Sequence, residues 1–239
     1  AYLRDTQRSQ VAQITTIRPY STSEFMVLDP FTRRNLELTE TIRGRQSKGS
    51  LLDVLDRTIT AMGARLLRTW ISQPLLEVRR LNARLDAVEA LASDELLRAE
   101  VREHLRGVSD LERLATRLVA GKATPRELVA LRLTLLAIPA ITARLASVRP
   151  LEPLLERLDD CADLTDLVAR AIADEPPATL DKMGIIRGGY SDELDGIMRA
   201  TQDARDWIAE LEPKERARSG IGSLKVGFNK VFGYYIEVS

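Results

Sequence analysis

Apolar residues recur at helical spacing along most of the chain, in steps of three and four from residue 77 to about residue 145. Residues that favour helix N-termini precede several of these segments, namely Asp29, Ser50, Thr60, Asp110 and Thr124. Prolines at 139, 150 and 153 are expected to break or kink the next part of the helical pattern. Two short helices are expected within residues 151–174 and a loop over 175–189. The pattern predicts a mainly α fold, a multi-helical core bundle.

The two ends of the pattern differ from its middle. Residues 25–29 read as a short extended segment, and residues 191–218 read as one long helix of about 40 Å. Glycines at 220 and 222 are expected to end that helix. Period-two alternation on both sides of Gly233 then predicts a small β-hairpin. Because the last strand stops in mid-course, we expect the chain to be a piece of a larger protein.

Composition changes this picture little. Lys plus Arg and Asp plus Glu number 35 each, so no global basic field attracts a nucleic acid, and any DNA contact must be local. The single cysteine, Cys161, excludes an internal disulfide and fits a reducing cytoplasm. We find no signal peptide and expect no apolar run that could span a bilayer.

Catalytic and metal-binding motifs have little support. Residues 44–50 have the glycine spacing of a phosphate-binding loop, but Ser50 stands where the lysine of such a loop is needed. His104 is the only histidine and Cys161 is remote from it, which argues against zinc and against a nucleophilic triad. The acidic pair Asp159 and Asp160 reads as a solvated cap. We therefore expect no catalytic residues and no metal site in this chain.

Four segments resemble the core region of the MutS family of DNA mismatch repair proteins. They are, in the order of that family, Phe25–Glu37, Ser50–Leu75, Gly189–Asp195 and Ser223–Ile236. The second segment reads Ser-Leu-Leu-x-Val-Leu-Asp-Arg-Thr, then Thr-x-Met-Gly-x-Arg-Leu-Leu-Arg-x-Trp and Gln-Pro-Leu. Matches at both ends and in the middle cover nearly the whole chain.

The resemblance implies a domain order: the tail of a connector domain over 1–20, a helical core with lever helices over 21–219, and the start of a clamp domain over 220–239. In that family the complete protein recognises mispaired DNA, uses ATP with magnesium, works as a homodimer and recruits a MutL-type partner. The mismatch-reading Phe-x-Glu motif and the ATP-binding loop are absent here. This chain would be a mechanical link between ATPase and clamp, without a cofactor of its own.

The resemblance and the hairpin pattern give two sets of site residues. In the hairpin, Lys225, Asn229 and Lys230 are candidates for contact with the DNA backbone. Spacing alone favours a half-buried hairpin with solvated lysines, and it is the resemblance that favours DNA contact for the segment as a whole. The structural signature of the resemblance comprises Asp56, Arg57, Thr60, Gly63, Arg65, Trp70 and Pro74. We expect Arg57, Arg65 and Arg68 to form surface ion pairs beside Asp53 and Asp56, and Gly63 to lie where two helices pack closely.

One alternative of a different class stays open. The same leucine-rich stripes suit a helical scaffold that binds other proteins and has no DNA role, with part of its apolar surface exposed as a docking groove. Fully buried stripes together with a protruding end near Lys225 and Lys230 would favour the lever interpretation.

Overall fold

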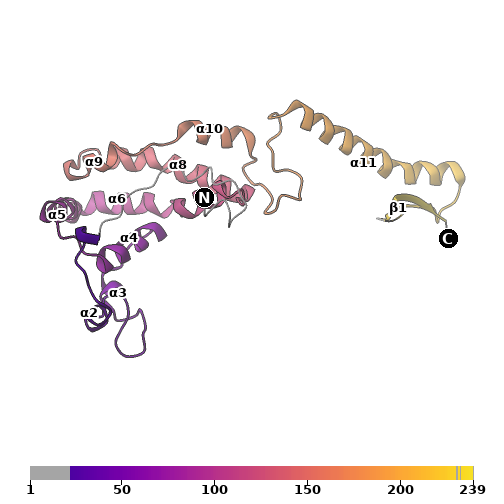
Figure 1. The fold of residues 1–239 in the computed structure, drawn as a ribbon. Coiled ribbons are helices and arrows are strands. Elements are labelled where there is room, and N and C mark those ends of the chain that lie inside the picture. Colours follow the sequence, from indigo (N-terminus) through magenta and orange to yellow (C-terminus); the bar gives the residue numbers. More distant parts are fainter. Residues whose placement is uncertain (1–21, 230, 232, 239) are drawn as a thin grey trace, which may run out of the picture. The chain divides into compact units, whose positions relative to one another are not determined.

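The computed structural model describes residues 22–229, 231 and 233–238, and helices dominate it (Figure 1). The prediction of a mainly α fold is confirmed. The elements are, in chain order, η1 (Thr22–Glu24), α2 (Pro30–Asn35), α3 (Leu51–Leu55), α4 (Ala61–Ser72), α5 (Val78–Ser93), α6 (Glu95–Arg106), α7 (Leu111–Val119), α8 (Pro125–Leu145), η2 (Arg149–Leu151), α9 (Glu152–Leu155), α10 (Ala162–Ala171), α11 (Asp192–Ser219), β1 (Lys225–Asn229) and β2 (Gly233–Glu237).

The chain divides into two compact units, residues 1–185 and residues 186–239. The long helix α11 thus groups with the hairpin. The boundary at 219/220 comes from the family resemblance and stays a prediction. The predicted connector tail, residues 1–20, lies outside the described residues.

The predicted helix starts are confirmed by hydrogen bonds. Side-chain oxygens of Asp29, Ser50, Thr60, Asp110 and Thr124 each accept a backbone N–H in the first turn of the helix that follows. The last of these is a reciprocal capping box, which satisfies an additional donor at the start of α8.

The centre of the first unit is α8. This helix packs against α6 and α10, which lie on either side of it in Figure 1, and α7 also contacts it. Leu131 and Leu135 of α8 and Leu114 of α7 form the buried cluster, with exposed fractions of 9% or less. Thr134 is fully buried, and its hydroxyl accepts a hydrogen bond of 3.0 Å from the backbone N–H of Ser109. These contacts tie the α6–α7 connection to α8.

Two expectations about α8 need correction. Pro139 does not break it, since the helix runs from Pro125 to Leu145 with that proline inside. Pro139 has no N–H, so the Leu135 carbonyl lacks its usual donor, and packing on both sides maintains the helix. In addition, α8 is long and apolar enough to cross a membrane by length and composition, contrary to the expectation from sequence. Core helices share these features, which makes the finding weak evidence for a membrane span.

The extended segment near the start of the described residues pairs with the end of α4. Phe25 and Leu75 form an antiparallel bridge, and the backbone N–H of Met26 donates to the Pro74 carbonyl at 2.8 Å. Leu75 is buried, with 3% of its surface exposed. A short two-segment ladder thus closes the corner formed by α2, α3 and α4.

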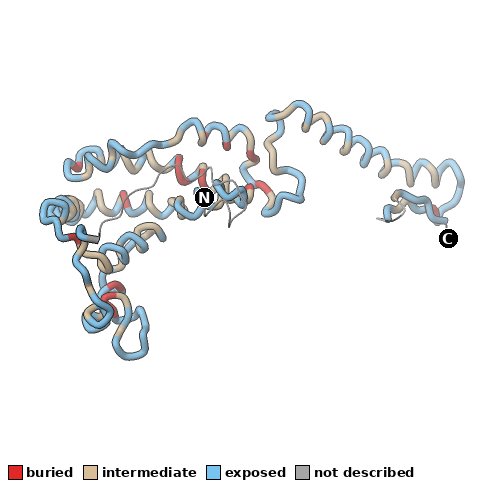
Figure 2. Tube along the Cα trace, in the orientation of Figure 1, coloured by how far each residue is buried: buried red, intermediate tan, exposed pale blue. Residues whose placement is uncertain are grey.

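The second unit consists of α11 and the hairpin. Ser191 caps α11, and Gly220 ends it in the left-handed conformation at φ 72°, as expected for a glycine C-cap. Pro213 lies inside the helix. Along α11 every described side chain is exposed or intermediate, which Figure 2 shows as a continuous run without buried positions.

Candidate nucleic-acid interface and its supporting contacts

The hairpin is antiparallel, and its register places the candidate side chains on one face. Lys225 pairs with Glu237, Gly227 with Tyr235, and Asn229 with Gly233. Since side chains alternate across a strand, Lys225, Asn229, Tyr235 and Glu237 share a face. Two of the three predicted DNA-contact residues therefore lie on the same surface. Lys230 lies outside the described residues.

Each of the two has a local role as well. Lys225 is directly across from Glu237, and an opposite charge at that position offsets part of its positive charge. The side-chain oxygen Oδ1 of Asn229 accepts a hydrogen bond of 2.7 Å from the backbone N–H of Val231, so it shapes the turn. Among the described residues, the Asn229 amide NH₂ group and the Lys225 ammonium make no hydrogen bond, so both can donate to a phosphate oxygen.

The opposite face of the hairpin is apolar. Phe228 and Tyr234 form a cross-strand aromatic pair with ring centroids 5.0 Å apart, and their exposed fractions are 61% and 57%. On the first face, the ring of Tyr235 covers Gly227, and a Cβ added at that glycine would lie only 2.7 Å from the ring. Gly227 thus permits Tyr235 to lie flat across the strand.

Two side chains near the end of α11 hold the hairpin. The Glu212 carboxylate accepts a hydrogen bond of 3.0 Å from the backbone N–H of Val226, and Arg216 Nε donates to the Leu224 carbonyl at 2.7 Å. Glu212 and Arg216 also form an ion pair of 2.7 Å with each other. These charge-assisted contacts fix β1 to the last two turns of α11. Sequence reasoning missed this junction, because Glu212 alone has no motif.

Basic residues near the end of α11 are already paired. Lys214 binds Glu210, Arg216 binds Glu212, and Arg218 binds Glu215, each at 2.7 Å. The pairs follow the i, i+3 and i, i+4 spacing that stabilises a helix surface. Nearby carboxylates thus offset this basic cluster, and Lys225 and Asn229 stay the better candidates for phosphate contact.

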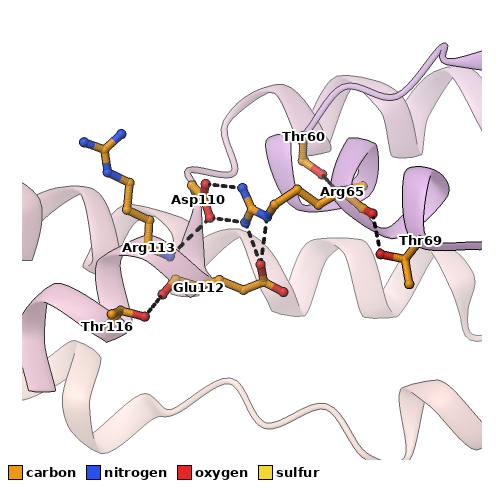
Figure 3. Close-up of polar contacts among 8 residues, drawn as sticks. Thr60, Arg65, Thr69, Asp110, Glu112, Arg113 and Thr116 are labelled. Atoms are coloured by element: carbon orange, nitrogen blue, oxygen red, sulfur yellow. Dashed lines mark hydrogen bonds and ion pairs between the residues drawn. The ribbon is translucent and has the colours of Figure 1, made fainter. Parts of the chain in front are cut away.

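Among the signature residues of the first unit, Arg65 of α4 makes the side-chain contacts that connect this helix to the start of α7. Its guanidinium donates two hydrogen bonds of 2.7 Å to the two carboxylate oxygens of Asp110, and it also contacts Glu112 at 2.6 Å (Figure 3). The hydrogen bonds from Arg65 hold the pKa of Asp110 at about 2, below its usual value. Asp110 also caps α7 through the Arg113 N–H, so one carboxylate joins both helices.

The expected ion pairs of this corner have different partners. Among the described residues, no ion pair joins the predicted arginines to Asp53 or Asp56. Arg57 donates instead to the backbone carbonyls of those two residues. The Thr58 hydroxyl and N–H bind the Asp56 carboxylate and lower its pKa, with smaller contributions from Arg57 and Arg68. Asp56 therefore shapes the turn between α3 and α4.

Asp53 differs slightly from a capping-box residue. Its own N–H donates to the Ser50 hydroxyl oxygen, as expected. Its carboxylate, however, accepts from the N–H of Gly49 at 2.9 Å rather than from Ser50. The N–H of Ser50 is already bound to the Ser47 carbonyl, which explains why the carboxylate reaches one residue further.

Thr60, Gly63, Trp70 and Pro74 have structural positions. The Thr60 hydroxyl accepts from the Gly63 N–H at 3.1 Å. A Cβ at Gly63 would meet that hydroxyl at 3.1 Å and Thr58 at 3.4 Å, so the close approach is to the segment entering α4 rather than to a second helix. Trp70 lies under the guanidinium of Arg84, 3.8 Å from its ring centroid. The Pro74 carbonyl accepts the Met26 N–H in the ladder that closes this corner.

The histidine, the cysteine and the acidic pair take part in no site that the structure describes. His104 lies in the last turn of α6, and Cys161 is a free thiol. Asp159 accepts from the Cys161 N–H at 2.9 Å, and so has a local turn role. Within the described ranges, no group of three or more metal-ligating side chains comes together.

Comparison with known proteins identifies the family. The family model MutS domain III matches residues 31–224. DNA mismatch repair protein MutS from Halothermothrix orenii is 48% identical over 240 residues, which cover all of this chain and 27% of that protein. The proteins of the same name from Symbiobacterium thermophilum and Brevibacillus brevis are 47% and 48% identical over the whole chain, which covers 28% of each. The chain thus spans about a quarter of these relatives, and it belongs to the MutS domain III family.

Proposed function

We propose that this chain is the core, or lever, region of a DNA mismatch-recognition protein. In that role it links an ATPase domain outside the chain to a hairpin that grips the DNA backbone. The observation that carries the proposal is the attachment of β1 to α11 through Glu212 and Arg216. Because these two contacts are charge-assisted, the hairpin and the end of α11 are expected to move together as one rigid unit.

The length of α11 supports transmission over distance. Its 28 residues correspond to about 42 Å of helix. A displacement at its N-terminal end would reach the hairpin without passing through a loop. Coupling of this kind requires two arrangements of the element, each favoured by a different nucleotide state.

The hairpin suits contact with phosphates rather than bases. Lys225 and Asn229 share a face, and Lys230 follows them in the sequence. Lysine and amide donors bind backbone oxygens and carry no sequence information, so the grip would be the same on matched and mismatched duplex. Mismatch recognition would then belong to another part of the whole protein.

The other properties of the family are proposed for the whole protein that contains this chain, and not for the chain by itself. They are ATP and magnesium in a separate domain, a homodimer, a MutL-type repair partner, mismatched double-stranded DNA as ligand and a cytoplasmic location without a membrane. The chain itself is proposed to be no enzyme. These attributes are assigned to the whole protein because the chain covers only about a quarter of the length of its relatives.

The scaffold alternative retains one observation in its favour. The predicted apolar stripe of α5, which comprises Leu81, Leu85, Val88 and Leu91, is not fully buried, since Leu85 and Val88 are 61% and 58% exposed. A docking groove for another protein would have such a surface. The same exposure is expected wherever the rest of a longer protein packs on this region, so it does not separate the two roles. The lever role is preferred because residues 31–224 match MutS domain III.

The test uses the full-length protein that contains this region. Replacement of Glu212 by Ala should weaken binding to mismatched duplex and reduce its release by ATP, while basal ATP turnover stays unchanged. Glu210→Ala is the matched control, because Glu210 lies on the same helix and pairs only with Lys214 in the described residues. Equal DNA affinity and equal ATP response in Glu212→Ala and Glu210→Ala would contradict the proposal.

A further inference from the structure

A pocket of about 430 Å³ lies between α2 and the loop that follows it. Its volume is within the range of small-molecule sites. Three arginines, Arg33, Arg34 and Arg45, line it together with a single carboxylate, Glu40. The lining therefore carries two net positive charges.

The three arginine side chains differ in the contacts that they make. Arg33 donates from Nε to the Leu28 carbonyl and from Nη2 to the Ser72 carbonyl, at 3.2 and 2.9 Å. It thereby anchors α2 to the end of α4. Arg34 and Arg45, by contrast, have no side-chain hydrogen bond or ion pair with another residue in the described part of the chain. Two guanidinium groups thus line one pocket without a counter-charge of their own.

The loop that carries Arg45 is held in place by its own hydrogen bonds. Glu37 accepts from the Ile42 N–H at 2.6 Å, and the Thr41 N–H donates to the Gln46 carbonyl at 2.9 Å. Arg45 itself has a φ of 48°, a left-handed conformation that costs energy for a residue with a side chain. Such a residue persists where its surroundings over-determine it, which is common at ligand clamps.

We propose that this pocket binds a phosphate group through Arg34 and Arg45. Each guanidinium is a planar fork that offers paired donors to one oxyanion. Two forks present more donors than the two oxygens of a carboxylate accept well, whereas phosphate offers at least three oxygens and a charge near −2. The Thr39 side chain at the pocket adds a hydroxyl group, whereas the Thr41 hydroxyl already donates to the Arg43 carbonyl at 2.8 Å. This site is separate from the hairpin and does not depend on the proposed lever role.

The experiment is a calorimetric and NMR titration of the chain with sodium phosphate at constant ionic strength, with sodium acetate as the carboxylate probe. Saturable phosphate binding is expected, with resonance shifts confined to residues 28–46. Arg34→Gln should weaken it at least tenfold. Arg45→Gly should do the same and still fold, since glycine favours the left-handed backbone.

Arg43→Gln is the matched control, because Arg43 lies in the same loop but does not line the pocket. It should change phosphate affinity less than twofold. The proposal is overturned if phosphate does not saturate, or if Arg43→Gln loses as much affinity as Arg34→Gln. Acetate binding as tight as phosphate binding would also overturn it and would indicate a site for an acidic protein segment.

Discussion

Arg65 and Asp110 are joined by two hydrogen bonds of 2.7 Å, which connect α4 to the start of α7 across 45 positions of sequence. The same carboxylate caps α7. One carboxylate therefore both caps α7 and binds α4 through Arg65. This makes Arg65 the part of the signature whose role is the most specific.

Replacement of Arg65 by Gln should return the pKa of Asp110 from about 2 toward its ordinary value of 3.8, because the hydrogen bonds from Arg65 are the largest cause of the depression. NMR titration of the Asp110 carboxyl carbon measures this directly. Arg68→Gln, one turn along the same helix, should leave the Asp110 pKa unchanged. An Asp110 pKa that stays near 2 in Arg65→Gln would contradict the assigned cause.

The pH dependence of stability follows from the same shift. A carboxyl with a lower pKa when folded contributes stability above its unfolded pKa and loses it as the pH falls through its folded pKa. The stability difference between the parent chain and Arg65→Gln should therefore be full above pH 4 and shrink between about pH 4 and pH 2. Urea unfolding at a series of pH values checks this, and a difference that grows on acidification would refute it.

Replacement of Gly63 by Leu should lower the free energy of unfolding by about 1–3 kcal/mol, the usual cost of overpacking. The added Cβ alone would press on the Thr60 hydroxyl that caps α4. Gly196→Leu is the control, since the space around Gly196 of α11 is open. Thermal unfolding followed by circular dichroism compares the two, and equal stability of Gly63→Leu and the parent would show that this approach is not tight.

Glu212→Ala should expose the N–H of Val226 to solvent and release β1 from α11. Hydrogen exchange of that amide is expected to accelerate at least tenfold, because a hydrogen bond to a charged group contributes roughly 1.5–3 kcal/mol. The paired amides in the middle of the hairpin should respond less. Glu210→Ala should leave the Val226 exchange rate unchanged, and a rate equally unchanged in Glu212→Ala would show that the junction does not hold the hairpin.

Much of the fold was predictable from local chemistry. Caps such as Thr60 and Thr124 act within three residues of themselves, and period-two alternation around Gly233 fixed the faces of the hairpin. The partner of Arg65 was not predictable in this way. Asp53 and Asp56 are near it in sequence, yet the fold places Asp110 beside it from 45 positions away, which is a long-range result.

The candidate interface also contains a long-range contact that the sequence does not predict. Sequence alternation predicted the hairpin, but it gave no sign that Glu212 accepts from the Val226 N–H fourteen residues away. Backbone donors have no sequence signature, so such a contact is visible only in the structure. Pro139 likewise suggested a break or kink, and α8 continues through it while neighbouring helices pack against it.

The central claim is that the hairpin binds the DNA backbone, and fluorescence-anisotropy titration of this chain tests it most directly. Matched and mismatched duplexes of equal length would be compared across a series of salt concentrations, with Lys225→Gln beside a Lys182→Gln control. The account predicts weak binding that falls steeply with salt, is equal for both duplexes, and is reduced in Lys225→Gln alone. Absence of binding at low salt, or equal affinity in Lys225→Gln and the control, would contradict it.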